Sequence, residues 1–437
     1  MKNLKKIALI TMFLSLSVQL IAQEDDGNDQ VVITAKKEYN KQAKKLLKNK
    51  KVIEAFNIIQ AQDGETIDEM IELTEIIAPP FKEEKRALRF KEMLEAAGAD
   101  KVWIDEEGNV LALRKGTTGK KLIGLDAHLD VVFPEGTDVT VKKVGDTLKA
   151  PGIGDDTRGL AMVLSVLKAF NKSNIKTKND VLFVGSVGEE GLGDLRGMKY
   201  IFNKSGLKID SWISIDGGDL GRINNAALGS VRYKVMIKGK GGHSWGAFGL
   251  ANPHHALAKA IDYFATEAAI YTASGPRTSF NVGRIGDGTS INAIPFESWM
   301  EVDMRSASPK SLTEIEKIFK RTVTAAVEDY NKSGVKGEVT LELIKIGERP
   351  SGELSPDLPL IQKAIAATTA IGGKPILTIG STNASIPISK NIPSICIGRG
   401  GNAGGGHSLH EWFVNEKSAE SIKLAFLILI SEAELSN

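Results

Sequence analysis

Short apolar segments alternate with helical segments between residues 66 and 215, and this alternation restricts the possible folds more than any other feature of the sequence. Strands and helices that alternate in this way usually form one sheet with helices on both faces. The sequence therefore predicts an α/β domain. Its strands are expected at residues 102–104, 110–113, 122–125, 181–184 and 212–215, and its helices at residues 66–77, 83–97 and 159–170.

A different order of elements begins near residue 226. It runs strand, helix, strand, strand, helix, strand, which is the split arrangement of a ferredoxin-like unit. After residue 345 the first pattern resumes, with a helix at 358–370 and a strand at 394–397. We therefore expect a discontinuous α/β domain with a mixed, largely parallel sheet, formed by residues 61–225 and 346–437, and an inserted ferredoxin-like α+β lid domain at residues 226–345.

The first 22 residues have the layout of a secretory signal peptide. Three lysines precede an apolar run at residues 7–22, and acidic residues follow. Because this run is shorter than the ~20 apolar residues of a membrane span, we expect residues 1–22 to be removed on export to the periplasm or the extracellular space, without a stable span afterwards. An uncleaved anchor is the alternative, because Leu20 stands where a small residue is usual. The lysine-rich residues 23–60 are expected to form a polar connector, or else a helix attracted to membranes.

The composition excludes several classes of protein. The chain has 56 Lys and Arg and 54 Asp and Glu, and this balance gives no basis for nucleic-acid binding. Cys396 is the only cysteine, so neither an intrachain disulfide nor a thiolate-rich metal site can form. Any metal must therefore be bound by histidine and carboxylate side chains.

Side chains that can bind metals follow the predicted strands. Each segment has an ordinary structural explanation by itself, since Asp favours helix N-termini and turns beside glycine. Open α/β sheets, however, bind ligands at the carboxyl ends of their strands, so the segments should meet there. The residues are His128 and Asp130 after strand 122–125, Asp155 at a helix start, Glu189 and Glu190 after strand 181–184, Asp216 after strand 212–215, and His407 after strand 394–397 and a glycine-rich loop.

This set of residue types predicts metal-dependent hydrolysis. Two imidazoles and three carboxylates can form two tetrahedral zinc sites if one carboxylate bridges the two ions. The acid that remains could take a proton from a metal-activated water and deliver it to a leaving amine. This is the chemistry of amide hydrolysis.

The ordered series of motifs resembles the co-catalytic di-zinc peptidases that include peptidase T, carboxypeptidase G and the aminoacylases, from about residue 60 to the C-terminus. The stretch Gly191 to Arg196 favours the peptidase T-like branch. The matching motifs are His128-x-Asp130, Asp155-Asp156-x-x-Gly159, Glu189-Glu190-Gly191, Asp216 and His407.

The resemblance implies two zinc ions per chain, with cobalt or manganese as alternatives, and a cis peptide bond between Asp155 and Asp156. It also implies a role for each residue of the series. By resemblance, His128 and Asp216 would bind one metal, Glu190 and His407 would bind the other, Asp155 would bridge the two, Glu189 would be the general base, and Asp130 would orient His128.

Three residues of the lid domain also match the family. His243, in Gly-Gly-His-Ser, would stabilise the oxyanion, reaching the neighbouring active site of a homodimer that pairs through its lid domains. Asn292 and Arg305 would contact the carbonyl or carboxylate of the substrate. The structural alternatives are a loop histidine, a turn asparagine and an ion pair between Arg305 and Asp303. One departure is Asn383, where many relatives have Asp, and substrate specificity therefore cannot be transferred.

These observations predict an exported zinc exopeptidase that hydrolyses small peptides such as di- and tripeptides. An N-acyl-amino-acid amidohydrolase would use the same metals and base, so only the substrate pocket separates the two activities. A non-catalytic exported binding protein is a third hypothesis. Such a protein, however, has no need of Glu189 beside a complete set of metal ligands.

Overall fold

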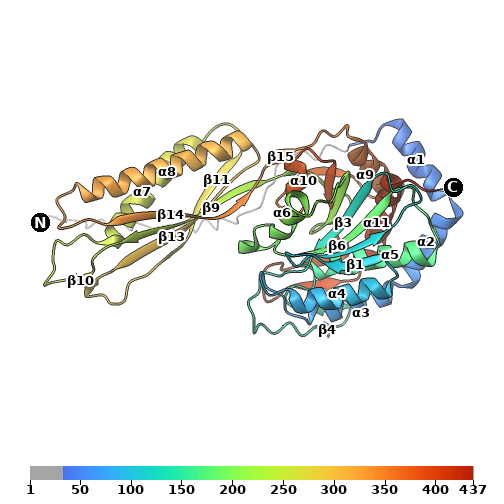
Figure 1. Cartoon of the computed structure of the whole chain (residues 1–437), viewed down its shortest axis with the longest axis horizontal. Helices are drawn as coiled ribbons and strands as arrows, with labels where there is room; N and C mark the ends of the chain where they lie inside the picture. The colour runs from blue at the N-terminus through green and yellow to red at the C-terminus, as the bar shows by residue number, and fades with distance from the viewer. Residues whose placement is uncertain (1–32, 437) are drawn as a thin grey trace, which may run out of the picture. The chain divides into compact units, whose positions relative to one another are not determined.

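The computed structural model describes residues 33–436. The predicted signal peptide at residues 1–22 lies outside the described residues and stays a prediction. Among the helices of residues 33–436, none combines the length and the apolar character that crossing a membrane requires. The described residues form a nine-stranded sheet, a four-stranded sheet with its own core, and two smaller sheets (Figure 1).

The nine-stranded sheet confirms the predicted α/β domain. Eight of its strands lie in the order β1 (Lys101–Ile104), β2 (Val110–Arg114), β6 (Asp180–Ser186), β3 (Leu122–His128), β7 (Ser211–Ile215), β17 (Ser394–Ile397), β8 (Arg222–Ala227) and β15 (Gly352–Glu353), and β16 (Ile376–Gly380) also pairs with β8. The four central strands, β6, β3, β7 and β17, are parallel, whereas most strands that flank them pair antiparallel. The carboxyl ends of the central strands therefore lie at one edge of a mixed sheet.

Helices cover both faces of this sheet because its buried strands alternate between two apolar cores. In β6, Val181 and Phe183 belong to one core, and Leu182 and Val184 belong to the other. The larger core includes residues of α4 (Glu84–Ala96), α5 (Thr157–Lys172), α9 (Pro359–Ala370) and α11 (Ser418–Ala433), and the smaller core includes residues of α6 (Arg196–Asn203) and α10 (Ser385–Ser389).

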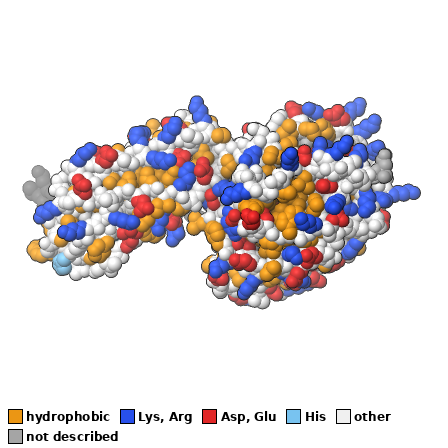
Figure 2. All heavy atoms as spheres, viewed as in Figure 1, with side chains coloured by type: hydrophobic (Ala, Val, Ile, Leu, Met, Phe, Trp, Pro, Cys, Tyr) orange, Lys and Arg blue, Asp and Glu red, His pale blue; other side chains and the backbone are white. Residues whose placement is uncertain are grey.

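Residues 23–60, predicted to form a polar connector or a helix attracted to membranes, are helical in their described part and pack against the larger core. This part forms α1 (Lys37–Leu47) and most of α2 (Lys50–Ala61), and α3 (Asp63–Thr74) follows, three residues earlier than predicted. Val52, Ala55 and Ile59 of α2 are fully buried in the larger core. These residues recur at the spacing of a helical face, but the lysines at residues 36–51, which come just before them, give the region a polar composition that obscures the pattern. The lysines themselves project from the surface where α1 and α2 lie (Figure 2).

The inserted segment has the ferredoxin-like arrangement predicted for the lid domain. Its strands β9 (Gly229–Lys238), β11 (Thr278–Gly286), β13 (Glu297–Ser306) and β14 (Thr340–Arg349) pair antiparallel in the order β11-β13-β9-β14. The helices α7 (Pro253–Thr272) and α8 (Pro309–Asn331) pack against this sheet (Figure 1). The short strands β10 (Gly242–His243) and β12 (Ala293–Ile294) form a separate pair.

A small four-stranded sheet that the sequence did not predict connects two loops of the candidate site. It consists of β18 (Asn402–Gly404), β19 (Trp412–Val414), β5 (Thr147–Lys149) and β4 (Lys142–Val144), in this order. β18 and β19 flank the segment that contains His407, and β5 leads into the segment that contains Asp155. The pairing of β19 with β5 therefore ties these two segments together.

Candidate active site

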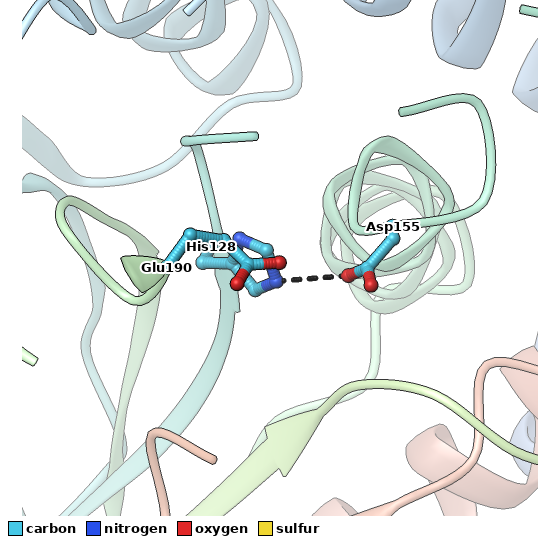
Figure 3. Close-up of side chains that lie close together, drawn as sticks. All are labelled: His128, Asp155 and Glu190. Atoms are coloured by element: carbon cyan, nitrogen blue, oxygen red, sulfur yellow. Dashed lines mark hydrogen bonds and ion pairs between the residues drawn. The ribbon is translucent and has the colours of Figure 1, made fainter. Parts of the chain in front are cut away.

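Two histidines face the same carboxylate. His128 is the last residue of β3, and its Nε2 lies 3.1 Å from Oδ1 of Asp155 (Figure 3). On the other side, Nε2 of His407 lies 3.3 Å from Oδ2 of Asp155. Each oxygen of Asp155 thus faces a different imidazole, as expected of a carboxylate that bridges two metal ions. The peptide bond between Asp155 and Asp156 is cis, as the resemblance implied.

Glu190 completes a compact group of candidate metal ligands. Its Oε1 lies 2.9 Å from Nε2 of His407. One donor atom each from His128, Asp155 and Glu190 lie within 4.8 Å of one another (Figure 3). Asp216, at the end of β7, lines the same cleft. The structure therefore gathers all five predicted ligands, and these donor atoms fit two divalent ions that share Asp155.

Asp130 orders the loop that carries the two adjacent glutamates. Its Oδ1 accepts the backbone N–H of Glu189 at 2.9 Å, and its Oδ2 accepts that of Glu190 at 2.7 Å. The contact with His128 comes mainly from the main-chain carbonyl of Asp130, 2.9 Å from Nδ1, while the carboxylate lies 3.6 Å away. Because a carbonyl only accepts, it fixes the proton on Nδ1 and leaves Nε2 free to bind a metal.

Glu411 holds the loop before Asp155 in place, and the sequence analysis missed it. Its carboxylate accepts the backbone N–H groups of Gly152, Gly154 and Asp155 at 2.7, 2.9 and 2.9 Å. The side chain is buried, with 2% of the residue exposed. The signal in the sequence was an acid directly before Trp412 and Phe413 and four residues after His407. Aromatic neighbours suggest burial, and a buried acid needs hydrogen-bond donors.

Glu189 is buried and paired with Arg349, which the sequence analysis also missed. Arg349 is the last residue of β14, and its Nη1 lies 2.9 Å from Oε1 of Glu189. Its Nη2 donates to the main-chain oxygen of Glu189. Burial raises the pKa of Glu189 to about 8, although the charge of Arg349 opposes this shift. A carboxyl group with such a pKa can accept and return a proton near neutral pH.

Arg399 is the third residue of the site that the sequence analysis missed. Its Nη1 lies 3.0 Å from Asp155, 3.4 Å from Asp156 and 3.8 Å from Asp216. Burial by itself would raise the pKa of Asp155, but Arg399 and His128 hold it well below its usual range. Burial raises the pKa of Asp156 and Asp216. The signal in the sequence was a single cation inside a glycine-rich loop.

A cleft of ≈ 450 Å³ is lined by five of the predicted site residues, Asp155, Glu189, Glu190, Asp216 and His407. Arg305 lines it, as predicted, and also donates to Asp303 at 2.6 Å, which was the structural alternative. Arg232 donates to the other oxygen of Asp303 at 2.9 Å and to the main-chain oxygen of Gly191 at 2.8 Å. With Arg222 and Arg349, four guanidinium groups line the cleft, and such groups suit a substrate carboxylate.

His243 and Asn292 lie together in the lid domain but not in this cleft. The strand that ends at His243 pairs with β12, and the main-chain oxygen of Asn292 accepts the N–H of Ser244 at 2.9 Å. Both residues are exposed, and neither is among the described residues that line the cleft. The described chain does not bring them to its own candidate ligands, and their predicted roles stay predictions.

A buried neighbour accounts for Asn383. Its Nδ2 donates to Asp126 at 2.6 Å and to Ser186 at 2.7 Å. Burial raises the pKa of Asp126 to about 6. An aspartate in place of Asn383 would put a second carboxylate beside Asp126 and would repel it. The amide of Asn383 instead donates a hydrogen bond to Asp126. Asn383, which differs from the Asp of many relatives, therefore does not line the cleft, whereas its neighbours Ser381 and Thr382 do.

The fold and the donor atoms define a metal-dependent hydrolase with a lid domain. The model of the peptidase family M20/M25/M40 matches residues 124–430, and the chain belongs to this family. The chain is therefore a metallopeptidase-type enzyme, and the predicted family is confirmed. The family depends on dinuclear metal centres, which agrees with the shared carboxylate of Asp155.

Curated relatives are similar to this chain in sequence, and solved structures are similar to it in fold. N-acetylcysteine deacetylase of Bacillus subtilis (strain 168) is 24% identical over 254 residues, 52% of this chain and 64% of that protein. The aminopeptidase PepT of Bacillus cereus ATCC 10987 matches with a TM-score of 0.66 at 20% identity, over 85% of this chain and 98% of that chain. The Bacillus subtilis YXEP protein, a dinuclear metal binding peptidase, matches with a TM-score of 0.61 at 17% identity, over 86% and 99%. The chain spans about half the length of the curated relatives it matches.

Metal binding is expected to release a proton from His407. Hydrogen bonds to Asp155 and Glu190 raise the pKa of His407 to about 10. The imidazolium therefore stabilises the metal-free fold fully below about pH 6.5, and this stabilisation is lost as the pH rises through 10. Since a metal binds the neutral ring, zinc affinity should rise between pH 7 and 9.

Calorimetric zinc titrations in two buffers with different ionisation enthalpies measure this release. The wild-type chain should release about one proton more than His407→Ala, because one titrating ring is lost. Equal proton release by the two proteins would contradict the expectation.

Proposed function

We propose that the chain is an exported, zinc-dependent exopeptidase that hydrolyses amide bonds of small peptides, with di- and tripeptides as substrates. The observation that carries the proposal is the position of Glu189, a buried carboxylate next to Glu190 in the cleft of the candidate ligands. A binding protein has no use for a proton acceptor there, whereas amide hydrolysis requires one. Export is proposed from the basic and apolar pattern of residues 1–22, and zinc from the imidazole and carboxylate ligands.

The proposed ligands are divided between two metals. His128 and Asp216 would hold one, Glu190 and His407 the other, and Asp155 would contribute one oxygen to each. When bound, the metals would supply Lewis-acid activation of a water molecule and of the scissile carbonyl group.

The protein itself would supply the proton transfers. Glu189 would accept the proton from the attacking water and then donate it to the leaving amine, for which its raised pKa is suited. Asp130 would fix the direction of this carboxylate through the backbone N–H of Glu189. Arg349 would hold the glutamate at the cleft when it is ionised.

The charge of the cleft supports a small substrate with a free carboxylate. The side chain of Arg305 is 39% exposed and binds Asp303 through one of its nitrogens, so its remaining donors can reach a ligand. A peptide with a free C-terminus carries such a carboxylate close to its scissile bond. An N-acyl amino acid does so too, and the similarity to N-acetylcysteine deacetylase makes amidohydrolysis of such compounds the second candidate function.

Substitution of the general base should separate metal binding from turnover. Glu189→Gln is expected to keep its metal and to lose turnover about 100-fold or more, because proton transfer by a side chain contributes at least this factor. Asp155→Ala should lose metal, since both ions would share this carboxylate. Metal content by mass spectrometry and peptide hydrolysis are the two measurements.

A matched control is Glu432→Gln, which removes a partly buried glutamate that is paired with Lys363 outside the site. It should keep both metal and activity. Full turnover by Glu189→Gln would remove Glu189 from the role of base.

A substrate panel should favour unmodified peptides. Hydrolysis rates for dipeptides, tripeptides and N-acetyl amino acids, measured with the zinc-loaded enzyme, should be highest for di- or tripeptides. Blocking the C-terminal carboxylate by amidation should raise KM, because the arginines lose their partner. Activity confined to the acylated compounds would reverse the ranking of the two candidate functions.

We also propose a homodimer that pairs through the lid domain and places His243 in the partner's active site. Apolar side chains near His243 support this: Trp245 and Phe248 are 88% and 82% exposed, and Ile291 is fully exposed. Exposed apolar groups that gather in this way mark interaction surfaces. A two-fold dimer would bury the same surface on both copies.

Mixing two inactive variants tests the dimer. Glu189→Gln lacks the base, and His243→Ala lacks the proposed oxyanion ligand. After exchange of subunits, one of the two sites in a mixed dimer has both residues, so activity should return. Light scattering gives the mass in solution. A fully active monomer, or no recovery in a mixture proven to exchange, would contradict the proposal.

A further inference from the structure

The side chain of Arg399 places a positive charge among the proposed metal ligands. It is 12% exposed, and its described ion-pair partners are Asp155, Asp156 and Asp216. Two of these acids, Asp155 and Asp216, are proposed ligands of the metal on the His128 side. A permanently charged guanidinium therefore shares two carboxylates with this metal.

On the other side, the guanidinium of Arg349 is bound to Glu189 and not to a proposed ligand. Among the described residues, the ion-pair partner of Glu190 is His407, at 2.9 Å, and His407 can give up its proton to a metal. Arg399 cannot deprotonate in this way. Each half of the ligand set contains one imidazole, but only the half with His128 and Asp216 also contains a fixed guanidinium charge paired with its carboxylates.

A second guanidinium adds to this asymmetry. Nη2 of Arg222 donates to the main-chain oxygen of Asp216 at 2.6 Å. Asp216 is therefore approached by Arg399 at its carboxylate and by Arg222 at its backbone. Two guanidinium groups therefore lie beside this proposed ligand before any ion binds.

We propose that Arg399 makes the two metal positions unequal: the first ion binds with Glu190, His407 and one oxygen of Asp155, and the second binds more weakly with His128, Asp216 and the other oxygen of Asp155, which Arg399 contacts. This inference rests on the metal site of the proposed function. The guanidinium repels the second ion and competes with it for Asp155 and Asp216, and both effects weaken binding at short range. Arg399 is then a positioning residue that sets the order of loading.

The surroundings of Arg399 argue against a purely structural role. Its neighbours Gly398, Gly400 and Gly401 have no side chains, and the described contact of its backbone is a long one, from Nε of Arg158 to its carbonyl at 3.5 Å. An arginine that served only to fasten this loop would have partners outside the ligand set. The described contacts of this guanidinium are confined to acids at or next to the metal positions.

Sequential metal titration tests the proposal. The full-length exported chain is stripped with a chelator and titrated with Co²⁺, whose visible absorption reports each equivalent, and with Zn²⁺ in a calorimeter. In the wild type the second equivalent should bind at least about tenfold more weakly than the first, because repulsion between the guanidinium and a nearby cation can easily exceed this factor. Arg399→Gln should reduce this ratio about tenfold or more, and Arg399→Lys, which keeps the charge, should retain most of it.

Controls separate the role of the charge from loss of the fold. Arg284→Gln removes an exposed arginine of the lid domain and should leave both affinities unchanged. Thermal unfolding of each metal-free variant shows whether it is folded, and Arg399→Lys supplies a second variant if Arg399→Gln does not fold.

Each outcome decides one claim. Two equivalents of equal affinity in the wild type, or a ratio that Arg399→Gln leaves unchanged, would overturn the role of Arg399 while keeping the metal site. Absence of any bound metal in the folded wild type would instead overturn the proposed function.

Discussion

Repulsion among buried carboxylates is the constraint on which this structure depends. The edge of the larger sheet holds six acids: Asp130, Asp155, Asp156, Glu189, Glu190 and Asp216. Charges that are taken out of water are costly unless they are paired or hydrogen-bonded. Separate groups compensate several of these acids. Backbone N–H groups donate to Asp130, imidazoles contact Asp155 and Glu190, and Arg349 pairs with Glu189.

The compensating groups come from distant parts of the chain. His128 ends a central strand, Arg399 and His407 belong to a loop near the C-terminus, and Arg349 ends the last strand of the inserted domain. The site is therefore complete only when the discontinuous domain has closed around the insertion.

The elements of the fold could be read largely from the sequence, because buried strands and amphipathic helices have distinct periods. The edge of the sheet at which the ligands meet could also be predicted from the sequence. Four of the ligand-bearing segments follow predicted strands, and these strands are parallel in the structure. α1 and α2 could not be read in the same way, because the lysines of residues 36–51 gave the segment a polar composition.

The candidate ligands could be predicted because His128, Asp155, Glu190, Asp216 and His407 are of the types that bind zinc. The groups that support them could not. Arg349, Arg399 and Glu411 act through contacts that span 160 to 256 residues of sequence, and no local pattern identifies such a partner. The placement of Asn383 against Asp126 was hidden for the same reason.

The three bonds that Glu411 accepts link the two ends of the catalytic half of the molecule. Its partner Asp155 is 256 residues away in sequence, and it receives its backbone geometry from the C-terminal segment. A chimera that exchanged only this last segment between relatives would therefore also alter the bridge between the metals. The C-terminal segment and the loop before α5 are therefore coupled by these bonds, and transplantation of an active site onto this scaffold has to carry both.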